Sequence, residues 1–172
     1  MIKKASFLAA AAILVIGCAP RIDIDDISIA PFKGGRKAAL SFTFDDGMKE
    51  HFTIAAPELE KRGWRGTFWL NGAAIHDLPQ QDTTHMTWAE VKKMSDAGHE
   101  MSNHGWSHAD LTAMSPRSAW EEMQRNDAAI EGRTGRRPTT FCFPFNAFNP
   151  SLLRLASEGR TGSWPRTSSS TS

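Results

Sequence analysis

The sequence lacks a strong net charge of either sign. Its 172 residues include 20 lysines and arginines against 19 aspartates and glutamates, so the formal net charge is +1, and it becomes −1 without an N-terminal segment that contains Lys3 and Lys4. Because no long-range field results, the chain is not expected to recruit nucleic acid or an anionic membrane surface. A neutral substrate fits this composition better.

Long apolar runs are absent apart from one at the N-terminus. Residues 5–17 form an apolar run that is too short to span a bilayer, and the positive charges of Lys3 and Lys4 precede it. This pattern predicts a signal peptide over residues 1–17. The mature chain is therefore expected outside the cytoplasm.

Cysteine is scarce, because only Cys18 and Cys142 are present. Cys18 ends the segment VIGC, which resembles the lipobox of bacterial lipoproteins, where cleavage precedes a cysteine that then carries the lipid. The resemblance predicts a lipid anchor in the bacterial cell envelope, at the outer membrane, its periplasmic face or the cell surface. An ordinary signal peptide with an incidental cysteine is the alternative. If Cys18 is lipidated, Cys142 has no partner, so a disulfide framework is not expected.

Residues 18–36 are predicted to be a tether ahead of the folded domain, because Pro31 and a following glycine pair interrupt any regular element. The segment also carries Asp23, Asp25 and Asp26. These aspartates lack the glycine and the terminal carboxylate of a calcium-binding loop. We interpret them as solvated charge.

Residues 37–159 alternate short apolar runs with amphipathic segments, as expected of one globular domain. The predicted strands are residues 37–44, 66–71, 100–104 and 140–145. The predicted helices are residues 50–62, 88–97, 116–132 and 150–159. Thr87 and Glu90 form a capping box for the second helix, and Ser115 caps the third. Four βα units in series predict an α/β fold with a parallel sheet and helices outside it.

Residues typical of a metal site follow two of the predicted strands. Asp45 and Asp46 follow the first, and His104 and His108 follow the third. Because the C-terminal ends of parallel strands share one rim of the sheet, these side chains are expected to meet. Gly47 breaks the strand, which allows both aspartates to face one pocket. Two imidazoles and one carboxylate are a usual ligand set for a catalytic divalent metal, with one position left open for water.

This ligand set would support hydrolysis of an amide or an ester. A metal held by Asp46, His104 and His108 would lower the pKa of a bound water, and Asp45 would accept its proton as the hydroxide attacks a carbonyl. The alternatives are that the two histidines are polar loop residues and that Asp-Asp-Gly is a plain turn. The occurrence of both motifs at equivalent strand ends favours the metal site.

The same residues resemble the motifs of the polysaccharide deacetylases, also called family 4 carbohydrate esterases. TFDDG at residues 43–47 resembles the first motif of that family, GHEMSNHGWSHADL at residues 98–111 resembles the second, and RPTTFCFPFN at residues 137–146 resembles the third. The resemblance implies that Asp45 is the base. The implied ligands of a divalent metal, usually zinc, are Asp46, His104 and His108. The pair Pro144-Phe145 is implied to lie where a backbone N–H helps hold the oxyanion.

Two positions depart from the pattern of the family. Gly105 stands where the family usually has a serine or threonine that braces the loop. Cys142 stands where the family commonly has an arginine that positions the base. The resemblance otherwise covers about residues 37–159, and it implies a distorted (β/α) barrel that removes acetyl groups from an N- or O-acetylated polysaccharide.

The later motifs of the family have no counterpart after Arg160. These are an aspartate-tryptophan motif and a histidine that serves as general acid, whereas residues 160–172 are polar and serine-rich. We therefore expect about four βα units of an incomplete barrel, a disordered or aberrant tail over residues 160–172, and impaired activity.

Two other functions remain open from the sequence alone. One is a non-catalytic lipoprotein that binds metal or carbohydrate, and the other is a truncated product without function. Trp106 lies between the two histidines and is predicted to stack on a sugar ring, or alternatively to pack the loop. The tryptophans expected in the core are Trp64, Trp69, Trp88 and Trp120.

Overall fold

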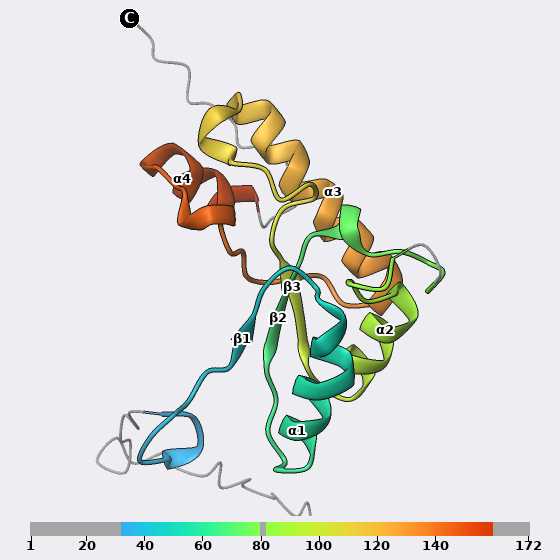
Figure 1. Ribbon diagram of the computed structural model, residues 1–172. Coiled ribbons are helices and arrows are strands. Elements are labelled where there is room, and N and C mark those ends of the chain that lie inside the picture. Colours follow the sequence, from blue (N-terminus) through green and yellow to red (C-terminus); the bar gives the residue numbers. More distant parts are fainter. Residues whose placement is uncertain (1–31, 80–81, 160–172) are drawn as a thin grey trace, which may run out of the picture. The chain divides into compact units, whose positions relative to one another are not determined.

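The computed structural model describes residues 32–79 and 82–159 (Figure 1). The predicted signal peptide, Cys18, most of the predicted tether and the tail over residues 160–172 lie outside the described residues. The chain divides into two compact units, Met1–Ala39 and Leu40–Ser172. In the described part of the first unit, a short 3₁₀ turn, η2, spans Lys33–Gly35. The elements below belong to the second unit.

A parallel sheet forms the centre of this unit, with the strand order β1 (Thr43–Phe44), β2 (Thr67–Leu70) and β3 (Glu100–Asn103). Phe68 and Leu70 of β2 lie on one face of the sheet and are fully buried, whereas Thr67 and Trp69 on the other face are half-buried. The parallel arrangement confirms the prediction. The first strand is shorter than predicted, because only the last two residues of the run over residues 37–44 join the ladder.

The predicted fourth strand over residues 140–145 does not form. This segment lies beside β3, but it makes a single parallel bridge, from Phe141 to Asn103, with one hydrogen bond of 3.0 Å from the N–H of Cys142 to the Asn103 carbonyl. The hydroxyl of Ser102 donates to the Thr140 carbonyl at 3.0 Å, which gives that carbonyl a partner outside a ladder. A proline follows shortly and cannot donate to a ladder, so the pairing stops.

The helices occupy the predicted places between the strands. They are α1 (Ala56–Glu60), α2 (Trp88–Asp96), α3 (Pro116–Thr134) and α4 (Pro150–Gly159). Short 3₁₀ turns are η4 (Gly72–Ala74), η5 (Leu111–Ala113) and η6 (Pro144–Asn146).

A π-helical stretch, η3 (His51–Ala55), precedes α1 within the helix predicted over residues 50–62. Pro57 explains the irregularity, because its nitrogen carries no hydrogen and cannot bond to the turn before it. The stretch nevertheless presents one apolar face to the core. Ala56 and Leu59 are buried, and Phe52 and Ala55 pack against the same core cluster.

The caps of α2 and α3 follow directly from local sequence. Thr87 accepts from the N–H of Glu90 while the Glu90 carboxylate accepts from the N–H of Thr87, which confirms the capping box. Ser115 caps α3 as predicted. The predicted end of α3 at Gly132 is wrong by two residues. The helix continues to Thr134, and Gly135 caps it with a left-handed φ of 76°, a conformation that glycine adopts readily.

Two buried apolar clusters hold the unit together. The first joins the sheet to α1 and α2 through residues such as Phe68, Val91 and Met94, and the second joins α3 to α4. Trp88 is buried as expected. Trp64 is not in the core, because it is 49% exposed and stacks on Phe42 at a centroid distance of 5.5 Å. Among the described residues, no helix has the length and apolarity needed to cross a membrane.

Candidate functional site

Asp45 and Asp46 lie in the turn that follows β1. Asp46 and Gly47 both have a left-handed backbone, with φ values of 71° and 70°. A Cβ atom at Gly47 would lie 2.6 Å from Cδ1 of Ile75, so a larger residue would be strained by the left-handed φ and would force the Ile75 side chain to shift. The sharp turn brings both aspartates to the rim of one cleft, as the sequence predicted.

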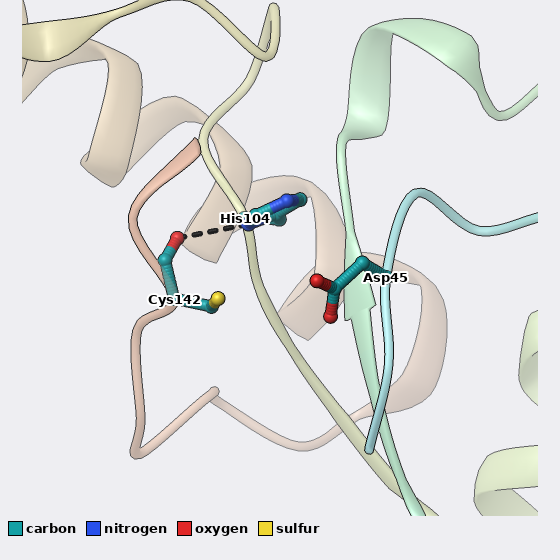
Figure 2. A group of neighbouring side chains, drawn as sticks. All are labelled: Asp45, His104 and Cys142. Carbon is teal, nitrogen blue, oxygen red and sulfur yellow. Dashed lines mark hydrogen bonds between the residues drawn. The ribbon is translucent and has the colours of Figure 1, made fainter. Parts of the chain in front are cut away.

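His104 follows β3 directly and is almost fully buried. Its backbone N–H donates to the Leu70 carbonyl at 3.0 Å, which fixes its main chain against β2. Its Nδ1 lies 2.9 Å from the Cys142 carbonyl oxygen (Figure 2). Because a carbonyl only accepts, Nδ1 carries the hydrogen and the lone pair is on Nε2. A metal-binding histidine is usually oriented by such a hydrogen bond.

Asp46, His104 and His108 converge in the cleft. Oδ1 of Asp46 lies 3.6 Å from Nε2 of His104 and 3.2 Å from Nε2 of His108, and the three ligating atoms all lie within 4.8 Å of one another. These spacings suit one divalent cation with bonds of about 2.0–2.2 Å. The structure therefore brings the three predicted ligands together.

The state of the Asp46 oxygen supports the fit to a cation. Oδ1 is buried and makes no hydrogen bond to any of the described residues, although both imidazole nitrogens are near. A buried carboxylate oxygen without a hydrogen-bond donor is costly, so such sites are normally paired or bound to a metal. The chemistry and the spacing of this donor set both fit zinc or a similar divalent ion.

The cleft has a volume of about 500 Å³. Its charged and polar lining includes Asp45, the three predicted metal ligands and Cys142, and its apolar lining is Phe141, Phe143, Phe145, Phe148 and Leu153. Phe145 is 69% exposed and packs edge-on against the ring of His108 at a centroid distance of 4.6 Å. The lining of the cleft thus combines ionisable side chains with apolar ones.

Backbone strain is concentrated around the cleft. In the described part of the chain, the residues other than glycine with positive φ are Asp46, His108, Phe145 and Asn146. All four belong to the loops that form this site. Conformations of this kind cost of order 1–3 kcal/mol each and cluster at functional sites.

The turn η6 is closed by two hydrogen bonds within its own backbone. The N–H of Asn146 donates to the Phe143 carbonyl, and that of Ala147 donates to the Pro144 carbonyl. The N–H of Phe145 is not among the groups that bond within this turn. Pro144 packs against the turn between His104 and His108. A Cβ atom at Gly105 of that turn would lie 3.7 Å from Cγ of Pro144, which is an ordinary van der Waals contact.

Cys142 lies opposite Asp45, on the other side of His104 (Figure 2). Each of these three residues offers one potential ligand atom, and the three atoms all lie within 4.8 Å of one another. Burial raises the pKa of the Cys142 thiol, and the nearby carboxylates of Asp45 and Asp46 raise it further. The thiol is therefore uncharged near pH 7, whereas an arginine would carry a positive charge.

Trp106 lies beside the cleft and not in its lining. The guanidinium carbon of Arg125 is 4.0 Å from the centroid of the Trp106 ring, and the ring also packs closely on Gly72. Part of the aromatic surface is thus used within the protein. Stacking of Trp106 on a sugar ring stays a prediction.

Sequence reasoning missed one group of residues behind the histidine turn. Asn126 of α3 is completely buried and bonds to Asn103 and to the backbone at the end of β2. Asp127, the next residue of this helix, is also completely buried and bonds to Asn103 as well. A polar pair on the buried face of an otherwise amphipathic helix is the signal that points to such a network.

Comparison with known proteins places the chain in a family. The family model described as polysaccharide deacetylase matches residues 33–160, which is well over half of the chain. The peptidoglycan-N-acetylglucosamine deacetylase PgdA of Listeria monocytogenes is 27% identical over 114 residues, which are 66% of this chain and 22% of that protein.

Solved structures share the fold. The Streptococcus pyogenes deacetylase PplD, in complex with acetate, has a TM-score of 0.66 at 22% identity and covers 72% of this chain and 53% of its own. A family 4 acetyl xylan esterase from Clostridium thermocellum, in complex with a cobalt ion, has a TM-score of 0.56 at 28% identity and covers 67% of this chain and 53% of its own. The chain therefore spans about half of these structures and less than a quarter of PgdA.

Proposed function

Because the chain belongs to the polysaccharide deacetylase family, we propose that it is a metal-dependent hydrolase that removes acetyl groups from an N- or O-acetylated polysaccharide. The observation that carries the proposal is the buried Asp46 oxygen facing two imidazole nitrogens, with the exposed carboxylate of Asp45 on the same cleft. The similarity to a peptidoglycan deacetylase and to an acetyl xylan esterase supports both kinds of acetyl linkage.

The residues of the cleft divide the work of hydrolysis among them. A bound divalent ion supplies Lewis-acid polarisation of water and of the substrate carbonyl. Asp46, His104 and His108 would hold the ion, and the hydrogen bond from His104 Nδ1 to the Cys142 carbonyl keeps the Nε2 of His104 directed at the site. Asp45 takes the proton of the attacking water as general base.

Charge that develops on the substrate oxygen needs a donor. The N–H of Phe145 is suited to this role, because it belongs to a strained turn at the cleft and the following N–H groups are already bonded within that turn. A preorganised backbone donor stabilises an oxyanion more effectively than mobile water does.

The linkage that is cleaved depends on the leaving group. An amide nitrogen must gain a proton before it departs, and general acid catalysis is worth about 10²–10⁴-fold. In the described part of the chain, the titratable groups of the cleft are the base, the three ligands and Cys142, whose thiol is a weak acid because its pKa is raised. We therefore propose low turnover overall, with a preference for O-acetyl esters over N-acetyl amides.

The metal site is tested by metal content. The purified wild-type chain, incubated with zinc and then freed of excess ion, is expected to hold about one zinc ion per chain, the number that one three-ligand centre accommodates. The His104→Ala, His108→Ala double variant is expected to hold almost none. The His76→Ala, His85→Ala double variant is the matched control, because it removes two imidazoles outside the cleft. Equal zinc content in all three proteins would refute the ligand assignment.

Activity is tested by acetate release. With zinc present, release from acetylated xylan is expected to exceed release from chitin oligosaccharides, and Asp45→Asn is expected to abolish both because it removes the base. Robust release from the chitin oligosaccharides that depends on Asp45 would contradict the proposed ester preference. Zinc binding without any acetate release would instead favour a non-catalytic metal- or carbohydrate-binding protein.

A further inference from the structure

The metal-ligating turn lies on the side of α3. The turn runs from His104 to His108. Its backbone is hydrogen-bonded to Glu122 of that helix directly and is linked to Asn126 through the side chain of Asn103. Glu122 and Asn126 are four residues apart and so lie on one face of the helix.

Asn126 is the centre of a buried hydrogen-bond network. Its Nδ2 donates to the Leu70 carbonyl at 2.6 Å and to Oδ1 of Asn103 at 2.8 Å, while its Oδ1 accepts from the N–H of Gly72 at 3.0 Å. The backbone partners fix the orientation of the amide, because a carbonyl only accepts and an N–H only donates. Asn126 therefore joins the end of β2 to the residue that precedes the first histidine ligand.

Asn103 passes this restraint to the turn. Its Oδ1 accepts from the N–H of Gly105 at 2.8 Å, and its Nδ2 donates to the Met123 carbonyl at 2.8 Å and to Oδ1 of Asp127 at 2.6 Å. Asn103, Asn126 and Asp127 are all completely buried. A buried polar network whose members are bonded in this way is rigid and specifies one arrangement.

Glu122 holds the middle of the same turn. Its Oε2 accepts from both the N–H and the hydroxyl of Ser107 at 2.8 Å. The restraints thus act at Gly105 and Ser107, each next to one of the two histidines. The network also constrains the facing strand end, because a Cβ at Gly72 would lie 2.6 Å from Oδ1 of Asn126.

We propose that Asn126 and Glu122 are positioning residues, which hold the His104–His108 turn from α3 and brace it where Gly105 offers no side chain. The inference rests on the proposed function in so far as the turn binds a metal. Neither residue lines the cleft, so both act through the backbone of the turn.

The test compares two substitutions on the same helix, each of which removes a buried polar group. Asn126→Leu keeps the size of the side chain but removes its three hydrogen bonds. Thr134→Val removes the buried hydroxyl that bonds the Ile130 carbonyl and the Arg136 N–H, at the other end of α3. Partners that orient metal ligands typically contribute 10- to 100-fold to metal affinity, so Asn126→Leu is expected to weaken zinc binding by about tenfold or more. Thr134→Val is expected to leave zinc affinity unchanged.

Two further readouts separate positioning from general stability. The visible spectrum of the cobalt-loaded protein reports ligand geometry, and it is expected to change in Asn126→Leu but not in Thr134→Val. Glu122→Ala alters a partly exposed contact and leaves the core intact. It is expected to lower zinc affinity in the same direction by a smaller factor. If acetate release is measurable, kcat is expected to fall in Asn126→Leu and in Glu122→Ala, with KM little changed.

The outcomes distinguish this inference from the metal assignment. Equal zinc affinity in wild type and Asn126→Leu, or equal losses in Asn126→Leu and Thr134→Val, would overturn the inference. If the wild type itself bound no zinc, the metal assignment would fail, but exchange of the Gly105 amide hydrogen in metal-free protein would still decide the role of Asn126. That exchange is expected to accelerate in Asn126→Leu, and an unchanged rate would overturn the proposal.

Discussion

At the scale of single residues, two positions set the local shape and charge of the site. At Gly47, the left-handed φ and the contact that a Cβ would make with Ile75 disfavour any larger residue. At Cys142, a thiol lies near the carboxylate of Asp45, where the resemblance to the family implies an arginine. The local electrostatics are therefore dominated by negative charge and burial.

The first prediction concerns the acidity of Cys142. Burial raises the pKa of this thiol most strongly, and the Asp45 and Asp46 carboxylates add to the effect. Only the thiolate reacts with an alkylating agent. Asp45→Asn removes one negative charge, so the pKa of Cys142 is expected to fall and alkylation at a given pH is expected to speed up. Burial keeps the pKa above that of a free cysteine.

The measurement is the rate of alkylation by iodoacetamide against pH, followed by mass spectrometry of the peptide that contains Cys142 in metal-free protein. Glu121→Gln is the control, because this exposed carboxylate pairs with Arg117 on the surface of α3. An identical pH midpoint in wild type and Asp45→Asn would show that the carboxylate does not act on the thiol.

At the scale of single elements, α2 shows how local chemistry sets a helix boundary. The Glu90 carboxylate accepts from the backbone N–H of Thr87 and also from Lys49, which lies 41 residues earlier, at 2.7 Å. Partial burial acts to raise the pKa of Glu90, but the hydrogen bonds from Lys49 and Thr87 outweigh it and hold the pKa below its ordinary value of 4.5. One side chain therefore serves both the helix cap and a long-range ion pair.

The second prediction follows from this depressed pKa. Glu90→Gln preserves a capping-box residue but removes the charge, so it is expected to lower the free energy of unfolding at pH 7 by about 1 kcal/mol. A group whose pKa is depressed by folding stabilises the protein above its unfolded pKa, and that contribution is lost as pH falls through the folded pKa. The difference between wild type and variant is therefore expected to shrink below about pH 4.5.

Urea denaturation at pH 7 and at progressively lower pH measures this difference. Glu121→Gln is again a suitable control, since exposed i, i+4 ion pairs contribute only about 0.3–0.5 kcal/mol. A Glu90→Gln difference that stays constant across the acidic range would mean that the charge of Glu90 does not stabilise the fold.

At the scale of the whole molecule, the described residues form part of a (β/α) barrel. The sheet of the described residues has three parallel strands, whereas a standard (β/α) barrel has eight. The segment after α3 continues along β3 with a single bridge. Large exposed apolar side chains, including Phe145, Phe148 and Leu153, gather at the cleft beside this segment.

The third prediction concerns the location of the chain. We propose that the protein is anchored in the cell envelope through a lipid on Cys18, because the apolar N-terminal run is too short to anchor as a spanning helix. Bacterial cells that produce the full chain and are fed a radiolabelled fatty acid are expected to label the wild type and Cys142→Ser but not Cys18→Ser. Label that persists in Cys18→Ser would rule out this anchor.

The sequence by itself determined the features that depend on neighbours along the chain. The capping box of Thr87 and Glu90 and the N-cap at Ser115 arise from contacts over a few residues, so local patterns predict them well. The three proposed ligands were also predictable, because the C-terminal ends of parallel strands meet whatever their distance in sequence. These features need only the order of the elements and the chemistry of each residue.

Only the tertiary structure decided the features that depend on partners far along the chain. Asn126 acts on residues 23 and 56 positions away, and no local pattern assigns it those partners. The failure of the fourth strand was equally hidden, since the pairing of residues 140–145 depends on hydrogen bonds from β3 and not on their own apolar character. Local propensity describes what a segment favours, but the competition for each backbone donor and acceptor is settled only when the segments pack.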